Sequence, residues 1–183
     1  MKASLVRGEG FRPETSPDPR RDELLELLSA VKDPELPVVD IVELGIVRDV
    51  VVDGDSVRVD VTPTYSGCPA MQMIEQDIVA TLRGHGFSQV KVRNVFSPAW
   101  TTDWLSDATK QKLKDYGIAP PVAVAETEDG EHLVTIRRSR PTVECPYCES
   151  ANTEEKSEFG STACKAIHFC NSCRQPFDYF KSF

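Results

Sequence analysis

Residues 56–84 read SVRVDVTPTYSGCPAMQMIEQDIVATLRG, and this stretch decides the fold. Its first six residues alternate polar side chains with valine, which is the pattern of a half-buried strand. Beyond Pro69 the apolar side chains recur every three or four positions up to Gly84, as on one face of an amphipathic helix. The stretch therefore predicts a strand, a loop that carries Cys68, and a helix.

The flanking segments complete a mixed domain. They predict a helix at residues 22–32, a hairpin about an Asp-Gly turn at residues 47–64, and a third strand at residues 89–95. Residues 101–117 (TTDWLSDATKQKLKDYG) predict one last helix, with caps at Thr101, Thr102 and Asp103 and a stop at Gly117. The order αββαβα indicates a compact α+β domain over residues 21–117, and its apolar core is expected to be complete without the rest of the chain.

The remaining segments differ in composition from this domain. Residues 1–20 carry prolines among charges and predict a mobile arm. Residues 118–142 form a connector in which Asp129-Gly130 suits the turn of a further hairpin. Residues 143–183 form a small satellite that contains five of the six cysteines.

Composition excludes several classes of protein. The 183 residues have a formal net charge of −8 and a pI near 4.9, which argues against a broad phosphate-binding surface. No apolar run approaches the roughly 18 to 20 residues that span a bilayer, and the N-terminus lacks the apolar region of a secretory signal. We therefore expect a cytoplasmic protein with no membrane partner.

The satellite contains two Cys-x-x-Cys pairs. Cys145 and Cys148 are separated by 21 residues from Cys170 and Cys173, a spacing typical of a four-thiolate zinc ribbon. The alternatives are a four-thiolate iron–sulfur site and a dithiol redox motif. Seven of the 14 aromatic residues lie here, in a segment too short to fold without a metal or a disulfide. We predict a small β-rich zinc ribbon over residues 143–183.

Zinc ribbons often bind nucleic acid, but the charge of this one is unsuitable. Residues 143–183 carry four basic and six acidic side chains, which repel phosphate. We therefore expect no nucleic-acid partner. The fifth cysteine of the satellite, Cys164, is either an inert packed thiol or a reactive one beside Lys165 and His168.

Cys68 stands alone in the larger domain. Its position before a helix exposes it to free backbone N–H groups and to the positive end of the helix dipole, which favour the thiolate. Nearby side chains could supply further ligands for a metal or an anion. The hydroxyl groups are those of Thr62, Thr64, Tyr65 and Ser66, and the carboxylates are those of Asp33, Glu35 and Asp40. The alternative is that Cys68 only caps the helix and Asp33 only ends the preceding one. One cysteine cannot hold a metal alone, although a homodimer could share a site.

No catalytic pattern is evident. The sequence contains no Ser-His-Asp order, phosphate loop, dinucleotide fingerprint or HExxH, and its three histidines lie far apart. We therefore expect a protein that is not an enzyme. A thiol oxidoreductase that uses Cys68 or Cys164 is the enzyme-class alternative.

Three motifs carry a family resemblance. DPELPVVDIVELGIVRDV (33–50) and VDVTPTYSGCPAM (59–71) resemble the metal–sulfur cluster assembly domain of SufT-like proteins and eukaryotic cytosolic iron–sulfur targeting factors. The tail CPYC…EFGSTACKAIHFCNSCRQPFDYFK resembles that of the PaaD branch, phenylacetate-degradation proteins encoded with phenylacetyl-CoA epoxidase. The resemblance covers residues 20–183.

The resemblance implies both a role and site residues. It implies an accessory or maturation factor for the epoxidase, whose partners are the oxygenase and reductase subunits and an iron or iron–sulfur donor. The alternative is a structural or coupling subunit of the complex. The functional thiol would be Cys68, with Asp33, Glu35, Thr62 and Thr64 in the accompanying motifs. In the tail, Cys164 lies in the FGSTxCK element, and the zinc ligands would be Cys145, Cys148, Cys170 and Cys173.

Overall fold

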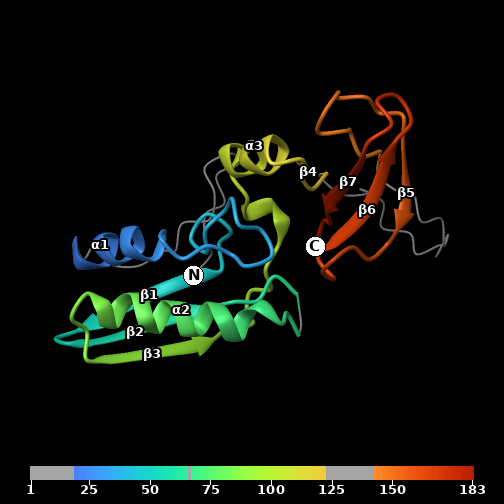
Figure 1. Ribbon diagram of the computed structural model, residues 1–183. Helices are drawn as coiled ribbons and strands as arrows, with labels where there is room; N and C mark the ends of the chain where they lie inside the picture. The colour runs from blue at the N-terminus through green and yellow to red at the C-terminus, as the bar shows by residue number, and fades with distance from the viewer. Residues whose placement is uncertain (1–18, 66, 123–141) are drawn as a thin grey trace, which may run out of the picture.

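The computed structural model describes residues 19–65, 67–122 and 142–183. In Figure 1 a lobe of helices on a sheet is joined through α3 and β4 to a second lobe of strands. The first lobe contains α1 (Pro19–Leu28), β1 (Val47–Asp53), β2 (Ser56–Val61), α2 (Ala70–Gly84) and β3 (Gln89–Asn94). The α+β class and the order of its elements are confirmed. Residues 1–18 of the arm predicted over residues 1–20 lie outside the described residues, as does the hairpin proposed near Asp129. The bound of the arm is wrong at its end, since Pro19 and Arg20 begin α1.

The first sheet has the strand order β1-β2-β3. Strands β1 and β2 are an antiparallel hairpin, and β2 pairs in parallel with β3, because α2 carries the chain back to the same end. Helix α2 runs along the sheet (Figure 1), and its apolar stripe is fully buried at Ile74, Ile78 and Leu82. Val59 of β2 faces the same core, as the alternating pattern requires.

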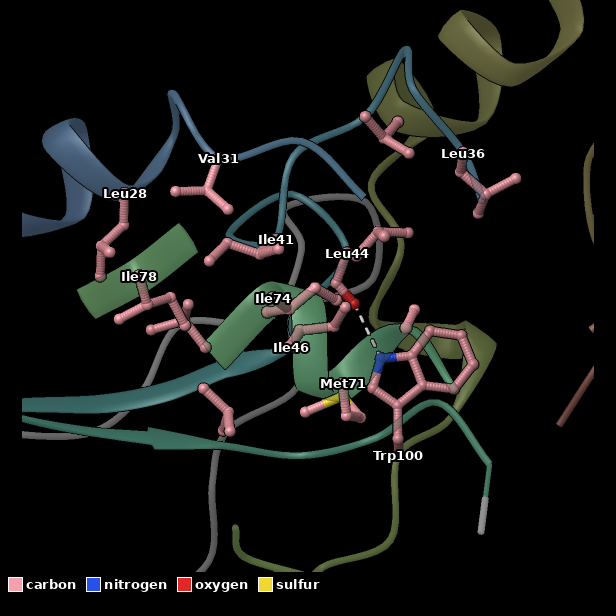
Figure 2. Packing of buried hydrophobic residues seen from close by; sticks show 14 of the residues in the cluster. Leu28, Val31, Leu36, Ile41, Leu44, Ile46, Met71, Ile74, Ile78 and Trp100 are labelled. Atoms are coloured by element: carbon pink, nitrogen blue, oxygen red, sulfur yellow. Dashed lines mark hydrogen bonds between the residues drawn. The ribbon is translucent and has the colours of Figure 1, made fainter. Parts of the chain in front are cut away.

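The loop between α1 and β1 contributes to the core. Leu36, Ile41 and Leu44 are buried there in the same cluster as residues of α2, and Figure 2 shows Ile41 and Leu44 beside that helix. The indole nitrogen of Trp100 donates a hydrogen bond of 2.7 Å to the carbonyl oxygen of Leu44. This loop carries Asp33, Glu35 and Asp40 and is called the acidic loop below. Its buried apolar side chains and the hydrogen bond from Trp100 hold it in place.

The prediction of one helix over residues 101–117 is wrong in its first part. A 3₁₀ turn, η1 (Thr102–Trp104), precedes the helix α3 (Asp107–Asp115). Ser106 is the true N-cap of α3, since its hydroxyl accepts the N–H of Thr109 at 3.1 Å. Trp104 and Leu105 are both buried in the core at this interruption.

The second lobe is a small β-rich ribbon, as predicted. Its sheet has the order β4-β7-β6-β5 and consists of β4 (Ile118–Ala119), β5 (Thr153–Ser157), β6 (Lys165–Cys170) and β7 (Pro176–Phe180). Strand β4 follows α3 directly and pairs in parallel with β7, so the chain leaving the first lobe becomes part of the ribbon.

The two lobes share a core, so the expectation that the first core is complete by itself is wrong. Phe180 of β7 is fully buried among the residues of the first lobe, where its ring centroid lies 6.1 Å from that of Trp100. Cys164 belongs to the same cluster. The preceding Tyr179 faces the ribbon's own core, because successive side chains of a strand point to opposite faces.

Gly117 lies at the junction of the lobes and has a φ of +90°. A Cβ built there would lie 2.8 Å from the hydroxyl oxygen of Tyr147. We expect Gly117→Ala to destabilise the protein by about 1–2 kcal/mol through backbone strain alone, with the steric contact in addition. Gly84→Ala is the matched control, since its added Cβ meets nothing within 4 Å. Equal thermal unfolding midpoints for the two variants would contradict this prediction.

No helix in the described ranges is both long enough and apolar enough to cross a membrane.

Candidate functional site

The four cysteines predicted as metal ligands converge at one end of the ribbon. The sulfur atoms of Cys145, Cys148, Cys170 and Cys173 all lie within 4.8 Å of one another. The Cys145–Cys173 and Cys148–Cys170 sulfur pairs are each 3.6 Å apart. Four thiolates around one tetrahedral ion, with metal–sulfur bonds of about 2.3 Å, have sulfurs about 3.8 Å apart. The residues present therefore fit a single metal ion.

The two turns that carry these cysteines have the same local structure. In each, the carbonyl of the first cysteine accepts the N–H of the fourth following residue, which is Glu149 or Arg174, at 2.9 Å. Both of these residues have a positive φ, 59° and 65°, although neither is glycine. The Cys-x-x-Cys spacing does not reveal this requirement, so sequence reasoning missed both residues.

Backbone groups also act on the sulfurs directly. The N–H of Cys173 donates to the sulfur of Cys170 at 3.5 Å. This hydrogen bond is the main cause that lowers the pKa of Cys170 to about 6. Cys170 therefore presents the thiolate that a metal requires, whereas burial raises the pKa of Cys145 and of Cys173, so a metal must displace their protons.

Cys68 lies on the loop between β2 and α2, one residue before the N-cap Pro69. Its carbonyl accepts the N–H of Met71, and its own N–H donates to the carbonyl of Tyr65. Gly67, with a φ of +84°, turns the chain so that the thiol follows directly. The side chain of Cys68 is half-buried and packs against the edge of the core.

The expectation that Cys68 favours the thiolate is wrong in its net direction. Burial raises the pKa of Cys68, and the carboxylates of Glu35 and Asp33 raise it further. The backbone hydrogen bond from Ala70, at the start of the helix, lowers it but is outweighed. The helix effect that the sequence indicates is present, yet burial beside an acidic loop is the larger influence.

Asp33 shapes the acidic loop. One of its carboxylate oxygens accepts the N–H of Glu35 at 2.7 Å and the N–H of Leu36 at 2.9 Å. The side chain is buried, and desolvation raises its pKa. Asp40 holds the next turn in the same way, with Val42 and Glu43 as donors. These two carboxylates are therefore occupied by backbone groups.

A pair of variants separates the shape of Asp33 from its charge. Asp33→Ala leaves two N–H groups without an acceptor and is expected to lower the free energy of unfolding by about 1–3 kcal/mol. Asp33→Asn keeps the accepting oxygen and removes a buried charge, so it is expected to retain wild-type stability near neutral pH. Urea unfolding measures both.

The same variants predict a pH dependence. Because the folded pKa of Asp33 is raised above 3.8, the folded state binds more protons than the unfolded state just above that pH. The stability of the wild type relative to Asp33→Asn should therefore fall as the pH rises from 3.8 through the folded pKa. A difference that rises with pH in this window would show that the carboxylate is stabilised in the fold.

Glu35, the other acidic residue of the loop, reaches the ribbon. The sulfur of Cys164 lies 3.1 Å from a carboxylate oxygen of Glu35 and 3.1 Å from the hydroxyl of Thr162. Burial, with help from Glu35, raises the pKa of Cys164 to about 12. The thiol therefore donates its proton to the carboxylate. Sequence reasoning named both residues and had no means to place them in contact.

The hydroxyl residues near Cys68 differ in how deeply they are buried. Thr62 is fully buried at the end of β2, where its N–H donates to the carbonyl of Ile46 at 2.9 Å. Thr64 and Tyr65 are half-buried on the loop. Burial and the neighbouring Cys68 raise the pKa of Tyr65 to about 12, so its hydroxyl remains protonated beside the thiol.

Comparisons with known proteins match both lobes. Residues 21–93 match the family described as "Iron-sulfur cluster assembly protein", and residues 129–181 match the "PaaD zinc beta ribbon domain". A protein of Escherichia coli named as a putative 1,2-phenylacetyl-CoA epoxidase subunit is 45% identical over 170 residues, which cover 93% of this chain and 98% of that protein.

Two further proteins match the first lobe. The "Fe-S protein maturation auxiliary factor" of Porphyromonas gingivalis is 32% identical over 94 residues, which cover 50% of this chain and 89% of that protein. A crystallised domain of unknown function, DUF59, from Bacillus anthracis has 34% sequence identity and a TM-score of 0.48, and the match covers 51% of this chain and 90% of that chain.

The fold, the cysteine loop and the four-cysteine group define an iron–sulfur cluster assembly domain joined to a metal ribbon. Its similarity to the E. coli protein extends over almost the whole of both chains. The chain belongs to the PaaD family.

Proposed function

We propose that this chain is an accessory factor that makes a phenylacetyl-CoA epoxidase active, by assisting the assembly or insertion of its iron or iron–sulfur centre. The observation that carries the proposal is the contact between Glu35 of the assembly-type loop and Cys164 of the ribbon, which joins the acidic loop of the first lobe to a thiol of the ribbon. One relative is named as an epoxidase subunit and another as a maturation factor, and both names support the proposal.

The factor is not itself an enzyme under this proposal. A thiol oxidoreductase needs a thiol of low pKa, and the pKa values of Cys68 and Cys164 are both raised. Their thiols are suited to bind a metal once a cation displaces the proton. Titration of the zinc-loaded protein with a thiol reagent across pH tests this, because a fast-reacting cysteine near neutral pH would favour the oxidoreductase.

The ribbon holds one structural zinc ion under this proposal. The mutual approach of all four sulfurs to within 4.8 Å supports a mononuclear site, since an iron–sulfur cluster places its core of several atoms between the thiolates. Bound zinc would supply a fixed link between the two Cys-x-x-Cys turns. Metal analysis and a visible spectrum of anaerobically purified protein decide the matter. Iron with acid-labile sulfide would replace zinc in the proposal.

The function is tested by reconstitution. The oxygenase and reductase subunits are expressed with and without this chain, purified, and compared in metal content and in phenylacetyl-CoA epoxidation. The proposal expects low metal content and low activity without the chain, and recovery when the chain and an iron or iron–sulfur donor are supplied. Equal metal content and equal activity in both preparations would overturn it.

A second candidate function is a structural or coupling subunit of the assembled monooxygenase. The name of the E. coli relative, which calls that protein a subunit, favours it. A coupling subunit remains in the working complex at fixed stoichiometry, whereas a maturation factor leaves it. Size-exclusion chromatography of the active enzyme separates the two. We place either function in the cytoplasm, where thiols such as Cys68 remain reduced.

A further inference from the structure

The segment that follows β7 is tied to other parts of the chain at each of its residues. The N–H of Lys181 donates to the carbonyl of Cys164 at 2.9 Å, and the hydroxyl of Ser182 donates to the carbonyl of Val122 at 2.7 Å. The next residue, Phe183, is bound by the first lobe. The segment therefore has a fixed path from the ribbon to the first lobe.

The main chain of Phe183 is held at the start of η1. Its oxygen accepts the N–H of Thr102 at 3.3 Å and the hydroxyl of Thr101 at 3.0 Å. Thr101 is the N-cap of η1, and Thr102 is its first residue. These two hydrogen bonds fix the point from which the side chain of Phe183 extends.

The ring of Phe183 lies against that of Tyr65. The two rings are stacked, with centroids 6.1 Å apart and an angle of 16° between their planes. The same ring lies 6.2 Å from Trp100 and 6.4 Å from Phe180, in edge and tilted arrangements. Aromatic pairs at such distances stabilise a structure beyond the area that they bury. Because Phe183 is still 41% exposed, it covers the edge of the core and does not fill its interior.

Tyr65 is the first residue of the tight turn that presents Cys68. Its carbonyl accepts the N–H of Cys68, three positions later, at 3.3 Å. Gly67 supplies the positive φ, +84°, that a turn of this kind needs at its third position. The other end of the turn is fixed to α2, since the carbonyl of Cys68 accepts the N–H of Met71. The placement of the Tyr65 ring thus helps to determine where the thiol is held.

We infer that Phe183 is a positioning residue for Cys68, because its ring holds Tyr65 and with it the turn that presents the thiol. The ribbon thereby acts on the cysteine loop of the assembly domain through an aromatic contact. The positioning follows from the contacts alone, whereas its importance for activation of the epoxidase rests on the proposed function.

The rate of alkylation at Cys68 measures how firmly the turn is held. The full chain, with zinc bound to protect the four ribbon thiols, is treated with iodoacetamide, and mass spectrometry of its peptides gives separate rates for Cys68 and Cys164. A half-buried sulfur reacts only when the turn moves it into solvent. Phe183→Ala is therefore expected to raise the Cys68 rate by about two- to tenfold, the range that loss of one aromatic pair gives. Phe183→Tyr retains the ring and should react at the wild-type rate.

A double-mutant cycle tests whether the ring acts through Tyr65. Tyr65→Leu should raise the Cys68 rate by itself, and Phe183→Ala should add little to it if the two rings act as one unit. Phe96→Ala, which removes a more exposed phenylalanine of the first lobe, is the matched control and should leave the rate unchanged.

Three results would overturn the inference. They are equal Cys68 rates in the wild type and Phe183→Ala, an equal rise at Cys68 and Cys164, and a full additional effect of Phe183→Ala on Tyr65→Leu. Retained zinc and an unchanged circular dichroism spectrum establish that each variant is folded. If Phe183→Ala fails this check, Phe183→Leu, which keeps apolar bulk without the ring, decides instead. A faster Cys68 rate with full activation of the epoxidase would retain the positioning and refute a role of Cys68 in the proposed function.

Discussion

Cys145→Ser is expected to destabilise both lobes, and not the ribbon alone. Loss of one of four ligands weakens a site whose metal-binding energy is also folding energy, about 10–16 kcal/mol in isolated zinc-finger peptides. When the ribbon loses its order, Phe180 leaves the core of the first lobe. Loss of a buried phenylalanine side chain costs about 3–5 kcal/mol, a large fraction of the stability of a domain.

Tryptophan fluorescence measures the expected destabilisation of the first lobe. Both tryptophans, Trp100 and Trp104, lie in the first lobe, and Trp100 contacts Phe180. We expect a red-shifted emission and a lower urea midpoint for Cys145→Ser. Phe180→Ala is the companion variant, since it removes the ring and leaves all four ligands in place. An unchanged tryptophan transition in Cys145→Ser would mean that the first lobe is stable by itself.

Under the proposed function, Cys68→Ser is expected to abolish most of the activation of the epoxidase while it preserves the fold. Serine is smaller, and its hydroxyl can accept the hydrogen bond that Ala70 gives to the sulfur. A hydroxyl is a poor ligand for a borderline metal ion, so activation of the epoxidase should fall by about tenfold or more. The measurement is the reconstitution assay, with ribbon zinc content and thermal unfolding as controls. Full activation by this variant would move the chemistry to the ribbon or to partner contacts.

Local patterns predicted much of the fold. The alternation before Val61 and the helical spacing after Ala70 each depend on neighbours within a few residues, and both elements are as expected. The interruption before α3 escaped because Thr101 and Ser106 are equally good caps by residue type, and burial of Trp104 decides between them. The burial of Phe180 in the first lobe could not be predicted either, since nothing in β7 indicates that a second core lies behind it.

The candidate sites were likewise predictable only where local sequence patterns determine them. Two Cys-x-x-Cys pairs indicate a four-thiolate site because each turn places two sulfurs by local geometry, and the four sulfurs do converge. The pKa of Cys68 could not be judged from the adjacent helix, because the opposing influence comes from Glu35 and from burial. The meeting of Glu35 with Cys164 depends on how the ribbon is docked, which no local pattern encodes.

The shared core also governs the biosynthesis of the protein. The first lobe is translated well before Phe180, so the apolar surface around Trp100 stays open on the nascent chain until β7 is made. Exposed apolar surface of this kind is what chaperones and proteases recognise. Because the ribbon is expected to need its metal to fold, newly made chains in cells starved of that metal would keep this surface open and would be degraded. The cellular level of the protein would then follow the supply of the metal.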